Sequence, residues 1–103
     1  MKRLKVRFRA SANADLLTIL EYVFDVSRSV ATARGFTRRI HERCLRIGDA
    51  PMGGSVRDDL FAGLRTVPFE RSAVIAYTVE DDCVRITNVF HGGRDYEALY
   101  RGE

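Results

Sequence analysis

Cysteine and histidine are scarce in this chain, and no pair of them has the spacing of a cross-link or a metal site. Cys44 and Cys83 are the only cysteines and lie far apart, without a Cys-x-x-Cys motif. His41 and His91 add no ligand cluster near either of them. A disulfide framework and a zinc centre both need closely grouped ligands. We therefore expect two buried free thiols, no metal site and no cofactor.

Long apolar runs are also missing. The most apolar window, residues 16–26, contains two carboxylates and a threonine, whereas a membrane-spanning helix needs about 20 predominantly apolar residues. The basic start of the chain, residues 1–5, is followed by Arg7 and Arg9 instead of the apolar core of a signal peptide. We therefore expect a cytoplasmic protein with no membrane partner.

Lysine is nearly absent. Lys2 and Lys5 are the only lysines among 17 basic residues, and 14 acidic residues leave a formal net charge of +3. The planar fork of arginine pairs bidentately with carboxylates or phosphates, so an arginine-rich surface suits an acidic protein or a nucleic acid. A charge of +3 is small for a nucleic-acid-binding domain. We expect no direct sequence-specific binding to nucleic acid.

The length and composition predict one folded domain that covers residues 1–103. The chain is 46% hydrophobic and 30% charged, which is typical of globular proteins and too apolar for a disordered one. A chain of this length has enough residues for a single core only.

Residues 3–9 alternate between basic and apolar side chains, which is the period of a half-buried strand. The basic face is either a solvated surface that resists edge-to-edge aggregation or a floor for the carboxylates of a partner. The apolar face would carry Leu4, Val6 and Phe8, and the basic face Arg3, Lys5, Arg7 and Arg9.

A helical hairpin is predicted to follow. Ser11 can cap the first helix and Ser29 the second. Gly35 would permit close approach of the two helices. Helical spacing relates Leu16, Ile19, Leu20, Val23 and Ser27 in the first helix. The buried stripe of the second consists of Ala33, Phe36, Ile40, Cys44 and Ile47.

Two further surfaces of this hairpin have alternative interpretations. Leu17, Phe24 and Val26 widen the apolar surface of the first helix, which we interpret as core packing within the chain, with a partner groove as the alternative. The outer face of the second helix is basic and predicts a solvated surface, with an acidic partner as the alternative. Its members are Arg34, Arg38, Arg39, Arg43 and Arg46.

Three strands are predicted in the second half, at residues 64–69, 73–79 and 84–90, the last two joined by an acidic turn. Asp95 can then cap a short C-terminal helix over residues 96–100. The order β-α-α-β-β-β predicts an α+β fold. We expect the helical hairpin to pack on one face of a mainly antiparallel sheet and the other face to remain exposed.

A family resemblance rests on motifs in this second half. Together with the order of elements, they resemble the ParE branch of the ParE/RelE toxin superfamily over nearly the whole chain. The motifs are Asp59-Leu60, Gly63-Leu64-Arg65, Ile75, Tyr77, Val79, Val89 and His91-Gly92-x-Arg94-Asp95. The resemblance implies a RelE/ParE-like fold and the toxin component of a type II toxin–antitoxin system. It further implies neutralisation by a ParD-like ribbon-helix-helix antitoxin and inhibition of DNA gyrase by binding.

The RelE branch supplies the alternative function, ribosome-dependent mRNA cleavage. Arg94 and Tyr100 stand where that branch has an Arg and a Tyr, but Val74 stands where it has another Arg, and no lysine follows Lys5. Loss of a group that stabilises developing charge costs about two to three powers of ten in rate. We therefore expect a binding inhibitor with no catalytic residues instead of an enzyme.

These considerations predict two binding sites. We expect the target to contact Arg94, Tyr100, Arg65 and His91. We expect an acidic antitoxin segment to bind the exposed sheet face. Strand parity places Arg3, Lys5, Arg7, Val74, Ala76 and Arg85 on that face, and a one-residue bulge would reverse the parity locally.

Overall fold

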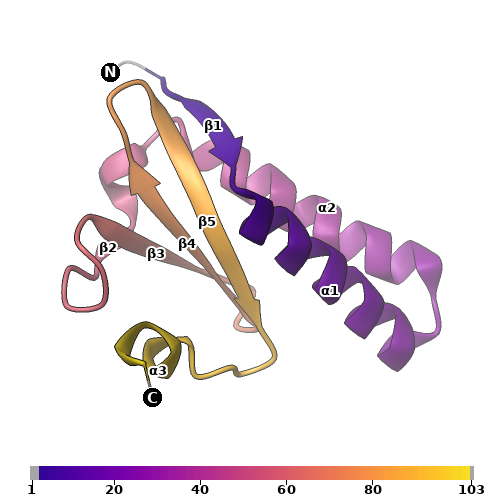
Figure 1. Cartoon of the computed structure of the whole chain (residues 1–103). Coiled ribbons are helices and arrows are strands. Elements are labelled where there is room, and N and C mark those ends of the chain that lie inside the picture. Colours follow the sequence, from indigo (N-terminus) through magenta and orange to yellow (C-terminus); the bar gives the residue numbers. More distant parts are fainter. Residues whose placement is uncertain (1–2, 103) are drawn as a thin grey trace.

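The computed structural model describes residues 3–102, so Met1 and Lys2, at the basic start of the chain, and Glu103 lie outside the described part. Two helices precede most of the sheet, and a short helix closes the chain (Figure 1). The elements are β1 (Lys5–Phe8), α1 (Ala10–Ser27), α2 (Val30–Ile47), the 3₁₀ turn η1 (Pro51–Gly53), β2 (Ser55–Val56), β3 (Leu64–Phe69), β4 (Ala73–Val79), β5 (Cys83–His91) and α3 (Tyr96–Arg101).

The sheet has the strand order β1-β5-β4-β3-β2. β1 pairs with β5 in parallel, and the other neighbours pair antiparallel. The predicted α+β fold is confirmed, as are the three predicted strands of the second half, to within a residue at each end. The prediction omitted β2, because two residues are too short to display an alternating pattern.

α1 and α2 form an antiparallel hairpin along one face of the sheet (Figure 1). Ile19 of α1 and Ile40 of α2 meet Ile75 and Ile86 of the sheet in one core cluster. Ser29 caps α2, since its side chain accepts a hydrogen bond from the Thr32 amide at 3.1 Å. The core therefore lies on the predicted stripe of α2 and on Leu16, Ile19 and Val23 of α1, whereas Ser27 is exposed.

The first helix starts differently from the prediction. α1 begins at Ala10, so Ser11 lies inside it and caps nothing. The Ser11 hydroxyl instead donates to the Thr87 carbonyl at 2.6 Å. A distant acceptor on β5 has replaced the local amide that a capping serine would use, and the prediction for Ser11 is wrong.

Side chains of α1 also complete the edge of β5. β1 pairs with β5 only as far as Ile86, so the rest of that edge has no neighbouring strand. Asp15 accepts hydrogen bonds there from the Val89 amide at 2.9 Å and from the Asn88 side chain at 3.0 Å. A helix therefore supplies the acceptor that a sheet neighbour would otherwise provide.

The opposite face of the sheet is not open, contrary to prediction. Leu64, Ala76 and Phe90 form a second buried cluster there, against which Leu60, Tyr96 and Tyr100 pack. The ring of Phe90 stacks on the ring of Tyr96, with 5.1 Å between the ring centroids. The short α3 therefore folds back as a partial cover of this face.

The outer surface of the hairpin is more apolar than expected. Leu17 is 58% exposed, Phe24 36% and Val26 69%, so the prediction that they belong to the core is wrong. Gly35 is not needed for close helix packing either, because a Cβ there would meet only the Arg39 guanidinium at 3.7 Å. Within residues 3–102, no helix is long and apolar enough to cross a bilayer.

Candidate functional site

The outer edge of β1 forms the most basic strand surface. Lys5 and Arg7 are exposed on it, and Arg7 lies beside Arg85 of β5 in register. Arg85 is half-buried and pairs with Glu80 at 3.1 Å, and these hydrogen bonds hold the pKa of the Glu80 carboxyl below its ordinary value. Lys5, Arg7 and Arg85 are called the basic edge below.

A shallow groove of 520 Å³ follows this edge, lined by residues 3–7 and by Leu45. Because β1 is the last strand on its side of the sheet, its outer backbone groups have no neighbouring strand. Such an edge can accept an extended peptide as an additional strand. Arg3 also lines this groove, and its guanidinium pairs with Asp49 at 3.0 Å.

The two apolar residues predicted to accompany these cations lie elsewhere. Ala76 is 0% exposed in the cluster beneath α3, so its prediction as an exposed antitoxin contact is wrong. Val74 is half-buried and faces Phe90 in register, whereas Arg85 faces Thr78. The four-residue separation from Val74 to Thr78 amounts to about 13 Å along β4. Val74 therefore belongs to the far end of the strand.

His91 marks that far end of the sheet, and three hollows of 440, 230 and 100 Å³ meet at its side chain. The imidazole packs edge-on against the rings of Tyr22 and Phe36, with distances of 5.2 and 5.4 Å between the ring centroids. Burial lowers the pKa of His91, so the ring is neutral at pH 7. The largest hollow, lined by Tyr22, Val26, Gly35, Phe36 and His91 among others, is called the His91 groove.

Arg94 shares this end of the molecule with His91. Both residues line the two smaller hollows, and Val74 joins them in the smallest. The two positive-φ glycines that follow His91 turn the chain here, and Arg94 remains exposed after them. The structure therefore gathers Arg94, His91 and Val74 on one surface.

Tyr100 lies in a different cavity, on the sheet face opposite the helical hairpin. This cavity of 430 Å³ is lined by Arg9, Phe61, Glu80 and Thr87 as well as Tyr100. Burial raises the pKa of the Tyr100 hydroxyl above its ordinary value of 10.0. Tyr100 is therefore protonated at neutral pH. It lines neither of the two hollows described above that Arg94 lines.

The Arg65 side chain binds the loop between α2 and β3. Its guanidinium donates to the Met52 carbonyl at 3.0 Å and to the Gly54 carbonyl at 2.9 Å. The buried Tyr77 hydroxyl holds the same loop, donating to the Pro51 carbonyl at 2.8 Å and accepting from the Gly54 amide at 2.9 Å. Of the four predicted target contacts, only Arg94 and His91 lie together.

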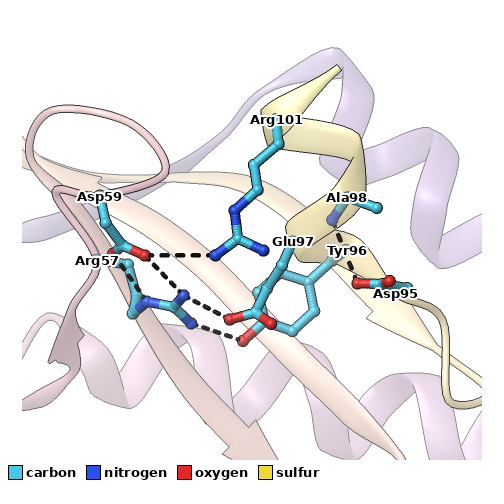
Figure 2. Close-up of polar contacts among 7 residues, drawn as sticks. All are labelled: Arg57, Asp59, Asp95, Tyr96, Glu97, Ala98 and Arg101. Atoms are coloured by element: carbon cyan, nitrogen blue, oxygen red, sulfur yellow. Dashed lines mark hydrogen bonds and ion pairs between the residues drawn. The ribbon is translucent and has the colours of Figure 1, made fainter. Parts of the chain in front are cut away.

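An ionic cluster fixes α3 against the segment before β3 (Figure 2). Arg57 makes two hydrogen bonds of 3.0 Å to Asp59, another to Glu97, and one of 3.4 Å to the Tyr96 hydroxyl. The hydrogen bonds to Asp59 and Glu97 raise the pKa of Arg57, and the hydrogen bonds from Arg57 lower the pKa of Asp59. Arg57 therefore joins the neighbouring Asp59 to Glu97 of α3.

The described residues offer little for covalent or metal chemistry. Burial raises the pKa of Cys44 to about 12 and also raises that of Cys83, so both remain thiols. Among residues 3–102, no group of three His, Cys, Asp or Glu side chains is placed to hold a metal ion. What the structure offers is partner surfaces: the basic edge, the cavity beside Tyr100 and the hollows around His91.

Comparisons with known proteins add a family and a fold. The sequence model for "ParE toxin of type II toxin-antitoxin system, parDE" matches residues 6–96. A solved structure titled "Chromosomal ParDE TA system from P. aeruginosa" superposes with a TM-score of 0.74, at 20% identity, over 86% of this chain and 96% of that chain. None of the curated proteins matches the sequence.

Proposed function

The chain belongs to the family of ParE toxins of type II toxin–antitoxin systems, and from this membership we propose that it inhibits DNA gyrase by binding, while a ParD-like ribbon-helix-helix antitoxin keeps it inactive. Gyrase acts on chromosomal DNA, so the site of action is the cytoplasm. The target-binding surface in this proposal is the end of the sheet that carries Arg94 and His91. Tyr100 serves as a separate, secondary contact.

One observation carries the proposal of binding without catalysis: Arg94 and Tyr100 lie in separate hollows. Cleavage of RNA requires an acid–base group and a cation that converge on one phosphate. Here Val74 stands near Arg94 where a second cation would be needed. The raised pKa of Tyr100 further disfavours it as a base at neutral pH.

A supercoiling assay with purified toxin and gyrase tests the target. Wild-type toxin is expected to block supercoiling or to trap gyrase on cleaved DNA. Arg94→Gln should weaken the inhibition about tenfold, which corresponds to the loss of one charge-assisted contact. Arg46→Gln, an exposed arginine on the outer face of α2, is the matched control and should inhibit like wild type. Unchanged DNA topology at doses that stop growth would reject gyrase as the target.

Ribosome-dependent mRNA cleavage remains the alternative, because Arg9 and Tyr100 line one cavity on the sheet face. Mapping of transcript 5′ ends after induction distinguishes the two functions. New ends that disappear in Tyr100→Phe would favour cleavage, and intact transcripts during growth arrest would exclude it.

Antitoxin binding in this proposal uses the basic edge. An acidic segment that folds on contact would place its carboxylates beside Lys5 and Arg7, as electrostatic complementarity requires. The double variant Lys5→Glu, Arg7→Glu should weaken the complex at least tenfold in calorimetry. Affinity within threefold of wild type would remove this surface from the proposal.

A further inference from the structure

The His91 groove is the most apolar of the five hollows described above and is open to solvent. It lies between the C-terminal end of α1, the N-terminal half of α2 and the end of the sheet. Its walls are large side chains that are only partly covered: Tyr22 is 52% exposed and Val26 69%. Exposed large apolar groups gathered in one concavity are typical of a protein-binding surface.

Gly35 on the floor of this groove has no explanation within the chain itself. Glycine is unfavourable inside a helix, and Gly35 lies in the interior of α2 without a positive φ. A Cβ at this position would meet only the end of the Arg39 side chain, at 3.7 Å. Ala31 lines the same groove one turn earlier, so two small residues bring the helix backbone close to solvent. A partner that packs closely against this backbone would account for the glycine.

The charges around the groove indicate the chemistry of that partner. Arg39 at its rim is already paired with Glu70, at 2.9 Å. Arg71 and Arg94 line the hollow that adjoins the groove at His91, and neither has an ion-pair partner among residues 3–102. Carboxylates that flank an apolar side chain would match this pattern.

The apolar walls favour a long-lived partner over a transient one, since permanent interfaces are the more hydrophobic class. In a toxin–antitoxin system the stored complex is the long-lived one. We infer that the His91 groove takes a bulky apolar side chain of the antitoxin, whose flanking carboxylates face Arg71 and Arg94. The inference rests on the proposed function and adds a second anchor to the basic edge. A segment seated there covers His91 and Arg94, so antitoxin and target compete for one surface.

A larger side chain at Gly35 fills the groove and tests the inference without weakening the fold. Gly35→Leu should occupy the space above the floor, while the added helix propensity raises the unfolding midpoint. Gly35→Ala raises helix propensity in the same way but adds only a methyl group to the groove. Ala14→Leu adds the same bulk to an exposed position of α1 outside the groove. The probe is a purified, full-length ParD-like antitoxin that binds the wild-type chain, titrated into each variant by calorimetry.

Gly35→Leu is expected to lose at least tenfold in affinity for the antitoxin, and both controls are expected to stay within threefold of wild type. Affinity of Gly35→Leu within threefold of wild type would overturn the inference. So would a wild-type dimer that Gly35→Leu dissociates in size-exclusion chromatography, because the groove would then hold a second copy of the chain. Gyrase inhibition is measured separately on wild type, so its failure rejects the target and leaves the calorimetric result on the groove intact.

Discussion

At the scale of single residues, the loop before β2 depends on one phenol. The Tyr77 hydroxyl is the partner of both the Pro51 carbonyl and the Gly54 amide, and Tyr77 is 0% exposed. A Cβ on Gly54 would approach that hydroxyl to 2.4 Å, so glycine is required there. The hydroxyl and the glycine are therefore one structural unit.

Tyr77→Phe should lower the free energy of unfolding by about 1–3 kcal/mol, because it leaves a buried amide and a buried carbonyl without partners. Urea denaturation followed by circular dichroism measures the change. Tyr22→Phe removes a hydroxyl from a 52% exposed ring and should shift stability by less than about 0.5 kcal/mol. Equal effects of the two variants would contradict this role of Tyr77.

His91 makes stability depend on pH. Burial lowers its pKa in the folded state below the ordinary value of 6.5, so the unfolded chain binds a proton more readily. The full contribution of His91 to the free energy of unfolding is therefore present above about pH 6.5. It is lost as the pH falls from there toward the folded-state pKa. Unfolding midpoints at pH 7.5 and pH 5.5 should differ more for wild type than for His91→Gln.

The residues of the His91 groove show what single-residue reasoning missed. His91 belongs to a local sequence motif, but its contacts with Tyr22 and Phe36 join β5 to the two consecutive helices α1 and α2, which lie far earlier in the sequence. The signal that was available is the excess of apolar residues on α1, which the single core of a small domain cannot cover. The helix-interior glycine was a second signal.

At the scale of elements, α3 is held by side chains from other parts of the chain. Asp95 caps it, accepting from the Ala98 amide at 3.2 Å, and Arg57 ties it to the segment before β3 (Figure 2). A helix of six residues is too short to be stable alone, so these contacts decide whether it stays docked.

Arg57→Gln should release α3 partially, because the pairs to Asp59 and Glu97 are lost together. Hydrogen exchange of the Ala98 and Leu99 amides is expected to quicken severalfold, while the core strands keep their protection. Arg101→Gln removes only an exposed pair of 3.9 Å to Asp59 and should leave exchange nearly unchanged. Unaltered exchange in Arg57→Gln would mean that Phe90 and its tyrosine neighbours hold α3 without help.

Most elements could be predicted from the sequence because each has a period or a cap of its own. The alternation of residues 3–9, the stripe of α2 and the cap at Ser29 are local signals. The errors arose where distant residues act. The Thr87 carbonyl accepts the hydrogen bond of the Ser11 hydroxyl, and α3 covers Ala76. A register shift at Ala76/Tyr77 interrupts the alternation of side chains in the β4–β5 pair. None of these contacts has a local signature.

At the scale of the whole molecule, the two proposed anchors for the antitoxin differ in physical character. The basic edge is charged and exposed, whereas the His91 groove is mainly apolar. Charge accelerates encounter, and apolar burial slows dissociation. The complex should therefore form quickly at low salt and persist at high salt.

Stopped-flow kinetics at several salt concentrations can check this division. Between about 0.1 M and 1 M salt the Debye length falls from about 10 Å to about 3 Å, so the association rate should drop about tenfold or more. The dissociation rate should change far less. The double variant Lys5→Gln, Arg7→Gln should show a flatter salt dependence of association than wild type. An association rate that is insensitive to salt would contradict a charged contact.

The parallel pairing of β1 with β5 has a consequence for synthesis on the ribosome. Lys5 lies opposite Cys83 and Phe8 opposite Ile86. β1 therefore cannot pair with its neighbouring strand until β5 has been synthesised. The helical hairpin can form soon after it is made, but the sheet that its apolar stripe covers is complete only when β5 has been added to β3 and β4. We expect the fold of a nascent chain to stay incomplete until β5 has been synthesised. The interval gives a co-translated partner time to be present when the toxin first becomes competent.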